Sequence, residues 1–103
     1  MRIIAVKTLK QYAKKNKIIA QSLFAWYAEA ENASWKNHNE LKEQIRNASV
    51  IGGKRVVFNI HGNACRLIVD VEYYLQIMFI VWIGTHKDYD KIDAKTVSYV
   101  KTN

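Results

Sequence analysis

The chain has 103 residues, half of them hydrophobic, and 16 Lys and Arg against 9 Asp and Glu give it a net charge of +7. This length allows one modest core but not two, and the apolar fraction excludes a disordered chain, so we expect a single domain over residues 1–103. The basic balance favours a polyanionic partner, either a nucleic acid or an acidic protein, although many soluble proteins are basic for solubility alone.

The chain opens with a short strand followed by a basic helix. Residues 2–6 are rich in Ile and Val and predict a strand. Thr8 is a suitable N-cap for a helix that places Leu9 and Ala13 on one face. This helix is rich in lysine, and no acidic residue occurs before Glu29. Such a charge run is typical of a solvated face, and contact with RNA is the alternative.

A second helix is predicted over residues 18–32. Its apolar positions recur at steps of four, three and four residues and fall on one face: Ile19, Leu23, Trp26 and Ala30. Because Trp26 and Tyr27 sit inside this amphipathic pattern, we interpret them as packing residues rather than base-stacking platforms. Residues 33–36 form a connector, and Asn37 or Asn39 then caps a short third helix that extends to Arg46.

The pattern changes after Gly52 and Gly53 to alternating or wholly apolar runs, which predict strands. We expect strands over residues 54–60, 64–74 and 76–83, with a tight turn at residues 62–63 between the first two. Three strands this close in sequence form an antiparallel meander. Helices that precede a run of strands indicate an α+β fold, with the N-terminal strand and the helices packed on a small, mainly antiparallel sheet.

Cysteine and hydropathy patterns bear on the compartment. Cys65 is the only cysteine, so no internal disulfide can form, and a reducing cytoplasm fits best.

The three histidines and Cys65 show no metal-ligand spacing, and we predict neither a metal nor another cofactor. Residues 77–83 are the most hydrophobic run, but a membrane-spanning helix needs about 20 such residues. We therefore interpret this run as a buried strand and expect no membrane association.

Three segments of the second half resemble one family: RVVFNI at 55–60, GNACRLIV at 62–69 and GTHKDYDKI at 84–92. Together with MRIIA at 1–5 and SWK at 34–36, they resemble the HigB-type toxins of the RelE superfamily. The resemblance covers nearly the whole chain and keeps the order and spacing of the motifs.

The resemblance implies a fold in which helices cover a small curved sheet. It implies that the protein is a ribonuclease that cleaves messenger RNA on the translating ribosome. It also implies the toxin half of a bacterial toxin–antitoxin pair. The cognate antitoxin, often a helix-turn-helix protein, holds such a toxin inactive and represses the operon, so that operator DNA is contacted only through the antitoxin.

Metal-free RNA cleavage needs a base for the 2′-OH, positive charge on the phosphorane and an acid for the leaving oxygen. We predict catalytic roles for Arg66, His86 and Tyr89, all in the matching motifs. Arg66 lies in an apolar run and either binds the scissile phosphate or pairs with Asp70 or Glu72 on its own strand face. His86 transfers a proton or binds phosphate, unless it is an ordinary surface histidine. Tyr89 either contacts RNA or anchors the C-terminal segment on the core.

Six further polar residues are predicted to contact RNA: Lys54, Arg55, Asn59, His61, Asn63 and Lys87. Asn59 and Asn63 match the two asparagines of the family motif. The amide of Asn59 is suited to orient a phosphate or a base, whereas Asn63 is also well suited to the turn itself. Lys54 and His61 stand where relatives carry varied polar residues, so we expect them to contact only the RNA backbone.

One position departs from the family. Many relatives carry Arg three residues before the Gly of the Gly-Thr-His motif, and this chain has Val81 there. The departure keeps a second function open, namely a catalytically weak RNA- or ribosome-binding module, or a corepressor, with the same fold. By alternation Val81 shares a face with Phe79 and Ile83, so it is either buried or part of a protein-binding surface.

Overall fold

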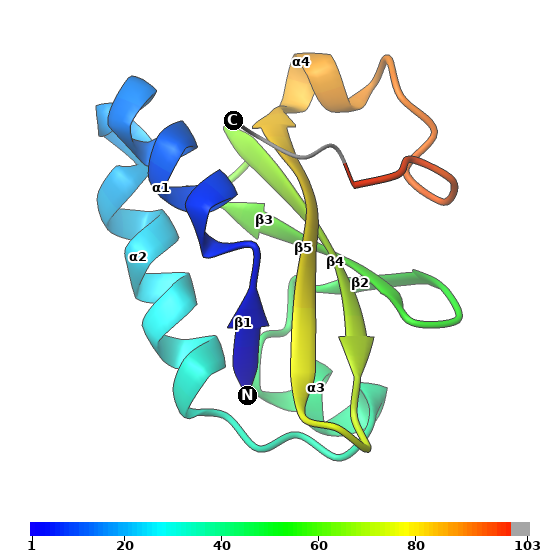
Figure 1. Ribbon diagram of the computed structural model, residues 1–103. Coiled ribbons are helices and arrows are strands. Elements are labelled where there is room, and N and C mark those ends of the chain that lie inside the picture. Colours follow the sequence, from blue (N-terminus) through cyan, green and yellow to red (C-terminus); the bar gives the residue numbers. More distant parts are fainter. Residues whose placement is uncertain (100–103) are drawn as a thin grey trace.

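The computed structural model describes residues 1–99 and confirms the α+β class. Its helices are α1 (Val6–Lys15), α2 (Lys17–Asn32), α3 (His38–Gln44) and α4 (His86–Tyr89). Its strands are β1 (Arg2–Ile4), β2 (Ser49–Gly52), β3 (Arg55–Ile60), β4 (Cys65–Glu72) and β5 (Ile77–Thr85). They form one sheet in the order β1-β5-β4-β3-β2, in which only the β1–β5 pair is parallel (Figure 1).

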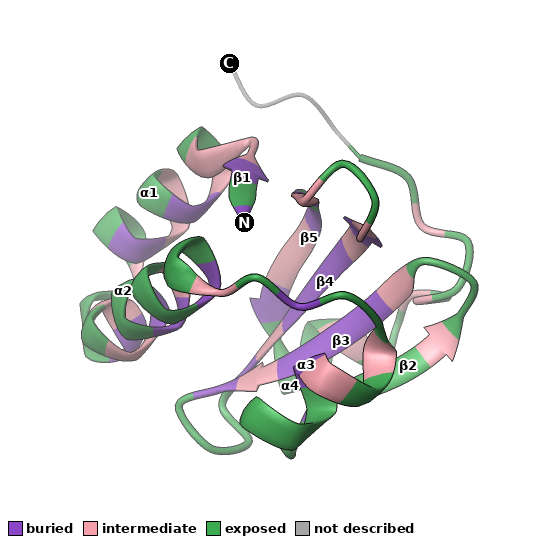
Figure 2. Cartoon of the chain, turned by 90° about the horizontal axis from the view of Figure 1, so that it is seen from below, coloured by how far each residue is buried: buried purple, intermediate pink, exposed green. Residues whose placement is uncertain are grey.

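The main core lies between α1, α2 and one face of the sheet (Figure 1). The predicted apolar face of α2 is buried, as expected from its spacing, and Trp26 meets Phe58 of β3 edge to face at 5.2 Å between ring centroids. Figure 2 shows buried positions recurring along both helices and along β3 and β4. Burial of these side chains supplies most of the favourable free energy of folding.

The N-terminal elements differ from the predicted ones. The strand ends at Ile4 rather than at residue 6, and α1 begins at Val6. Ala5 makes this turn in the left-handed conformation, with φ of 70°, and its side chain offers no cap. Thr8 therefore lies inside the helix and is not its N-cap, and its buried Oγ1 has no hydrogen-bond partner within residues 1–99.

The second half follows the predicted meander with two additions. Strands β3, β4 and β5 are sequential antiparallel neighbours, as the pattern indicates. The short strand β2 was not predicted, because its four residues pair only with β3 and three of them are exposed, which leaves little hydrophobic pattern. The single turn α4 was also missed, and it begins where Thr85 Oγ1 accepts a hydrogen bond from the Asp88 N–H at 3.1 Å. Asn37, one of the two predicted caps, does cap α3.

The other face of the sheet carries a second, smaller core. Val57, Ile68 and Val81 are buried there, and the chain after α4 covers them. A bulge in β5 shapes this face, since Ile68 pairs with Trp82 whereas Val69 pairs with Ile80. The extra residue is Val81, so the predicted alternation fails at this point: Val81 belongs to the second core, whereas Ile83 packs against the main core. Strict alternation could not reveal the bulge.

Candidate functional site

The strand register brings two of the predicted site residues side by side. Asn59 of β3 pairs with Arg66 of β4, and Arg66 pairs on its other side with Gly84 of β5. Alternation along β4 places Arg66 on the same face as Ile68, which is the face opposite the helices α1 and α2. Arg66 therefore lies on the central strand of the sheet, where pairing on both sides holds its backbone.

Arg66 is half-buried and has no carboxylate partner among residues 1–99. Its Nη1 donates only to backbone oxygens, those of Asn63 at 3.3 Å and Cys65 at 3.4 Å. The predicted alternative was a salt bridge to Asp70 or Glu72, but the ion pairs of these two acids are formed with other cations. The charge of Arg66 therefore remains available for an anion from outside the chain.

Two aromatic rings complete the surroundings of Arg66. The guanidinium Cζ lies 5.9 Å from the centroid of the Tyr89 ring, within the range of a cation–π contact. Tyr89 in turn lies 6.2 Å from the Trp82 ring. The indole rests against Gly84, where a Cβ atom would stand only 2.4 Å from Trp82 Cη2. A bulkier residue at 84 would thus displace the indole, which explains the glycine.

Sequence reasoning missed Trp82 as a member of this group. Its indole faces Tyr89 only because the β5 bulge turns Val81 and Trp82 toward the same core. The available signal was the pairing of a large aromatic with a glycine two residues later in a strand, since glycine in a strand often marks a close approach. We refer below to Asn59, Arg66, Trp82, His86 and Tyr89 as the Arg66 cluster.

His86 opens α4 beside the β3–β4 turn. Its backbone N–H donates to the Ala64 carbonyl at 3.2 Å, which ties the start of α4 to the turn. Its Nδ1 lies 3.3 Å from Asp90 Oδ2, and its side chain is about half exposed, at 48%. Nε2 has no partner within the described residues and is free to exchange a proton with solvent or substrate. Lys87 is exposed next to it.

The β3–β4 turn carries the two other predicted residues near this end of the sheet. His61 has a left-handed backbone, with φ of 56°, and its Nδ1 lies 3.1 Å from Ser22 Oγ on α2. Asn63 is exposed, and its backbone oxygen accepts from Arg66. The imidazole of His61 is therefore directed to α2, on the face of the sheet opposite the Arg66 cluster, and the turn borders the cluster through the backbone of Asn63.

Lys54 and Arg55 lie at the opposite end of the same strands. Arg55 lies four positions before Asn59, which is about 13 Å along a strand. Lys54 forms an ion pair with Glu72, whose hydrogen bond raises the pKa of the lysine. Arg55 Nε and Nη2 donate to the two oxygens of Asp70 at 2.9 Å each, and this pairing raises the pKa of Arg55. The structure therefore does not bring these two cations to the predicted site.

The thiol behind Arg66 is shielded from chemistry. Cys65 is 1% exposed, and its side chain belongs to the main core. Burial raises the pKa of the Cys65 thiol, so it stays protonated near neutral pH and cannot act as a nucleophile there. The neighbouring Tyr12 has its pKa raised to about 12, mainly by burial, and also stays protonated. Neither group is a catalytic base.

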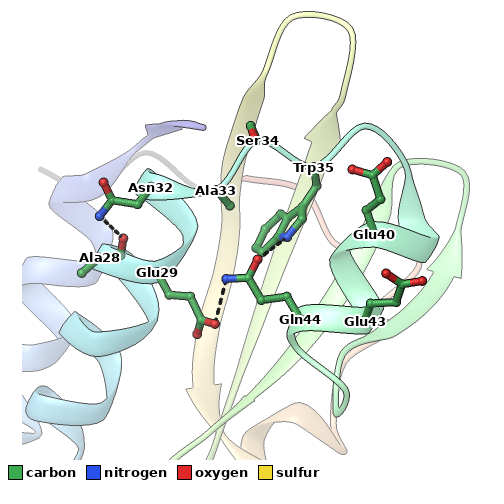
Figure 3. Close-up of a pocket in the computed structure, with 9 residues that line it drawn as sticks. All are labelled: Ala28, Glu29, Asn32, Ala33, Ser34, Trp35, Glu40, Glu43 and Gln44. Atoms are coloured by element: carbon green, nitrogen blue, oxygen red, sulfur yellow. Dashed lines mark hydrogen bonds between the residues drawn. The ribbon is translucent and has the colours of Figure 1, made fainter.

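A large hollow of about 940 Å³ lies away from the Arg66 cluster, between α2 and α3 (Figure 3). Its lining includes three carboxylates, from Glu29, Glu40 and Glu43. Gln44 spans it, accepting from Trp35 Nε1 at 2.8 Å and donating to Glu29 Oε2 at 3.0 Å. A lining of this charge repels phosphate, so the hollow is not an RNA site.

The described part of the chain shows neither a metal-ligand cluster nor a membrane span. No three His, Cys, Asp or Glu side chains within residues 1–99 converge on a point that could hold a metal ion. Over the same residues no helix combines the length and the apolar character that crossing a bilayer requires. The side chains of the Arg66 cluster offer a cation for an anion, an imidazole for a proton, and two rings and an amide for a planar group.

Comparison with known proteins places this arrangement in context. A model of the family HigB_toxin, described as the RelE-like toxic component of a toxin-antitoxin system, matches residues 19–92. The matched span is well over half of the chain and contains every residue of the Arg66 cluster. Comparison with curated proteins gives no match.

Proposed function

The chain belongs to the HigB family of RelE-like toxic components of toxin–antitoxin systems, and we propose that it is a ribosome-dependent messenger RNA endoribonuclease. The observation that supports this activity most strongly is the half-buried Arg66, which lacks a carboxylate partner in the described chain, pairs across the strands with Asn59 and lies against the ring of Tyr89. An unpaired cation of this kind is costly unless an anion completes it, and a phosphodiester does so.

The proposed reaction uses the 2′-OH of the substrate as the nucleophile. The 2′-oxygen attacks the adjacent phosphorus and loses its proton, the bond to the 5′-oxygen breaks, and that oxygen takes up a proton. The products are a 2′,3′-cyclic phosphate and a 5′-OH end. Arg66 stabilises the extra negative charge on the phosphorane through a forked contact. His86, whose Nδ1 faces Asp90, exchanges the proton through Nε2.

The other cluster members hold the substrate. Tyr89 and Trp82 present ring faces on which a base stacks, a contact worth about 1–3 kcal/mol per base. Asn59, opposite Arg66, orients the phosphate or a base with its amide. Asn63 and Lys87 flank the cluster and contact the RNA backbone, and His61, whose imidazole is directed to α2, contacts that backbone on the other side of the β3–β4 turn. The basic residues of α1, among them Lys10 and Lys14, are exposed and add positive charge for RNA on the ribosome.

Membership of this family implies a cognate antitoxin as partner. We propose that the antitoxin neutralises the toxin in the cytoplasm, that it carries a helix-turn-helix, and that the toxin reaches operator DNA only through it. The whole chain, residues 1–103, acts as one domain in this scheme. Induction in a growing bacterium tests the pairing: growth should arrest, and co-expression of the neighbouring gene should restore it.

The direct test of the activity is cleavage on programmed ribosomes. Wild-type protein should truncate a message at ribosome-bound codons, and His86→Gln should slow single-turnover cleavage about 100-fold because a proton-transfer group is lost. RNA binding, measured in parallel, should change little. His61→Gln is the matched control, since it removes an exposed imidazole that is directed to α2 and away from the Arg66 cluster, and it should weaken binding without slowing the chemical step.

The same assay decides between the two candidate functions. The arginine that many relatives carry at position 81 is absent, and this missing cation favours a binding module without catalysis. Val81 itself is 5% exposed and lies in the second core, so it is buried and not part of a protein-binding surface. Ribosome binding by the wild-type protein without any truncation would establish that function instead. Equal cleavage rates for wild type and His86→Gln, with weaker binding by the variant, would assign His86 to substrate binding and move proton transfer to another group.

A further inference from the structure

Arg55 connects the sheet to the chain that follows α4. We call residues 90–97 the C-terminal strap. While Nε and Nη2 of Arg55 are held by Asp70, Nη1 donates to strap carbonyls: Val97 at 2.6 Å, Ala94 at 3.2 Å and Lys95 at 3.4 Å. The side chain is only 15% exposed. One guanidinium thus ties a strand acid to three backbone oxygens of the strap.

The strap is continuous with the turn that carries His86 and Tyr89. Its first residues fold back on α4 through hydrogen bonds from the Asp90 N–H to the His86 carbonyl at 3.1 Å and from the Ile92 N–H to the Tyr89 carbonyl at 3.2 Å. Apolar strap residues then pack on the second core, together with Tyr89 itself. The position of Tyr89 over Arg66 therefore depends on where the strap is fixed, and Arg55 fixes it near its far end.

We propose that Arg55, held by Asp70, is a positioning residue for cleavage: by anchoring the strap it sets Tyr89 and His86 relative to Arg66. This inference rests on the proposed nuclease function. It assigns Arg55 a role other than the RNA contact expected from the sequence, because its donors already have partners and an RNA phosphate would have to displace Asp70. A planar fork can hold a carboxylate and point at a carbonyl at once, which a lysine cannot do.

The test compares two substitutions that alter the net charge in opposite directions. Arg55→Gln lowers it from +7 to +6 and Asp70→Asn raises it to +8, yet each breaks the anchor. A positioning role predicts that both lower the single-turnover cleavage rate, by about tenfold, because small displacements of reacting groups are costly. It also predicts that the RNA dissociation constant of Arg55→Gln stays within about twofold of the value for a control variant with the same net charge.

A direct RNA contact predicts a different pattern. Arg55→Gln would then weaken RNA binding and lower the dependence of log K on log salt by about 0.7, the value for one contact to single-stranded RNA, while Asp70→Asn would bind as well as wild type or better. That result would overturn the proposal. Arg55→Lys separates the two roles again, since it keeps the charge but loses the fork: positioning predicts a slow enzyme, and a phosphate contact predicts nearly normal cleavage.

Matched charge controls come from α3. Lys42→Gln and Glu43→Gln make the same two changes in net charge at exposed positions. Within residues 1–99 neither side chain forms a hydrogen bond or ion pair with the strap, so both variants should cleave at the wild-type rate. If Arg55→Gln does not fold, Asp70→Asn and Arg55→Lys carry the comparison.

Hydrogen exchange tells failure of this proposal apart from failure of the nuclease function. The Thr96 and Val97 amides donate to the Asp93 carbonyl in the strap, at 3.1 and 2.9 Å. Both should exchange at least tenfold faster in Arg55→Gln and Asp70→Asn than in wild type, whether or not the protein cleaves RNA. If the wild-type protein cleaves no RNA, the proposed nuclease function is wrong, and the exchange rates still test whether Arg55 anchors the strap. If the wild-type protein cleaves RNA and both variants cleave it at the same rate, Arg55 is not a positioning residue.

Discussion

Two arginines on the same face of the β3–β4 ladder differ in the residue that lies across from them. Arg55 pairs with Asp70 at one end of the ladder, and Arg66 pairs with Asn59 at the other. The carboxylate opposite Arg55 takes two of its donor groups, and carbonyls of the strap take a third. The amide opposite Arg66 carries no charge, and within residues 1–99 no carboxylate pairs with this arginine. A single cross-strand neighbour thus separates a structural cation from one that is available to a substrate.

The neighbours along the strands strengthen this contrast. The Arg55 end also holds the Lys54–Glu72 ion pair, so cations and acids balance there. The Arg66 end holds aromatic rings, an exposed imidazole and a turn, with Asp90 engaged by His86. Positive charge that is balanced within the chain contributes nothing to RNA affinity, so we expect the binding site at the unbalanced end.

The largest expected effect comes from a third arginine on this face. Val81→Arg restores the residue of many relatives. The new guanidinium would lie in the second core, and Asp70 is already paired with Arg55. A buried charge without a partner destabilises a protein by about 3–5 kcal/mol. We expect a lower midpoint of thermal unfolding and no faster cleavage. A folded variant that cleaves faster than wild type would show that position 81 reaches the substrate.

Removing the unbalanced cation should abolish activity without harming the fold. Arg66→Gln deletes the charge that stabilises the phosphorane, and loss of such a group costs about 10²–10³-fold in rate, or about 2.7–4 kcal/mol. Because Arg66 has no ion pair to lose within residues 1–99, the unfolding midpoint should remain close to that of wild type. Cleavage on programmed ribosomes and thermal unfolding measure the two quantities. Undiminished cleavage by the folded variant would remove Arg66 from the site.

Most of this contrast was hidden from the sequence. The meander, the buried face of α2 and the family motifs follow from local patterns, and they predicted that Arg66 and Asn59 would lie in the sheet. The register does not follow from those patterns. The sequence left Arg66 either to bind a phosphate or to pair with Asp70 on its own strand, and the ion pair of Asp70 with Arg55 removes the second alternative.

The remaining errors have the same physical origin. The β5 bulge turns Trp82 toward Tyr89 and Val81 into the second core, and a bulge leaves no mark in strict alternation. The strap is a segment without regular secondary structure for most of its length, so its attachment to Arg55 depends on tertiary contacts alone. Local patterns thus predict the elements, while the long-range partners of charged groups decide which of them form the site.

The last prediction gives Arg66 the same kind of cross-strand neighbour that Arg55 has. Asn59→Asp places a carboxylate opposite Arg66, at the cross-strand position that Asp70 occupies opposite Arg55. The new pair competes with the phosphate for the guanidinium. Since an exposed or half-buried pair is worth only about 0.2–1 kcal/mol, the competition is partial, and we expect cleavage to fall by up to about fivefold, less than in Arg66→Gln. Single-turnover cleavage measures this.

Two controls show whether the loss acts through Arg66. Asn47→Asp makes the same charge change at an exposed position before β2 and should leave the cleavage rate unchanged. In the double variant Asn59→Asp/Arg66→Gln, the aspartate has no guanidinium to capture, so it should add little to the loss caused by Arg66→Gln alone. Interacting residues give such non-additive effects, whereas independent ones multiply their fold-changes. A further loss as large as that of Asn59→Asp alone would mean that Asn59 contacts the RNA by itself, and the cross-strand neighbour would no longer explain why the two arginines differ.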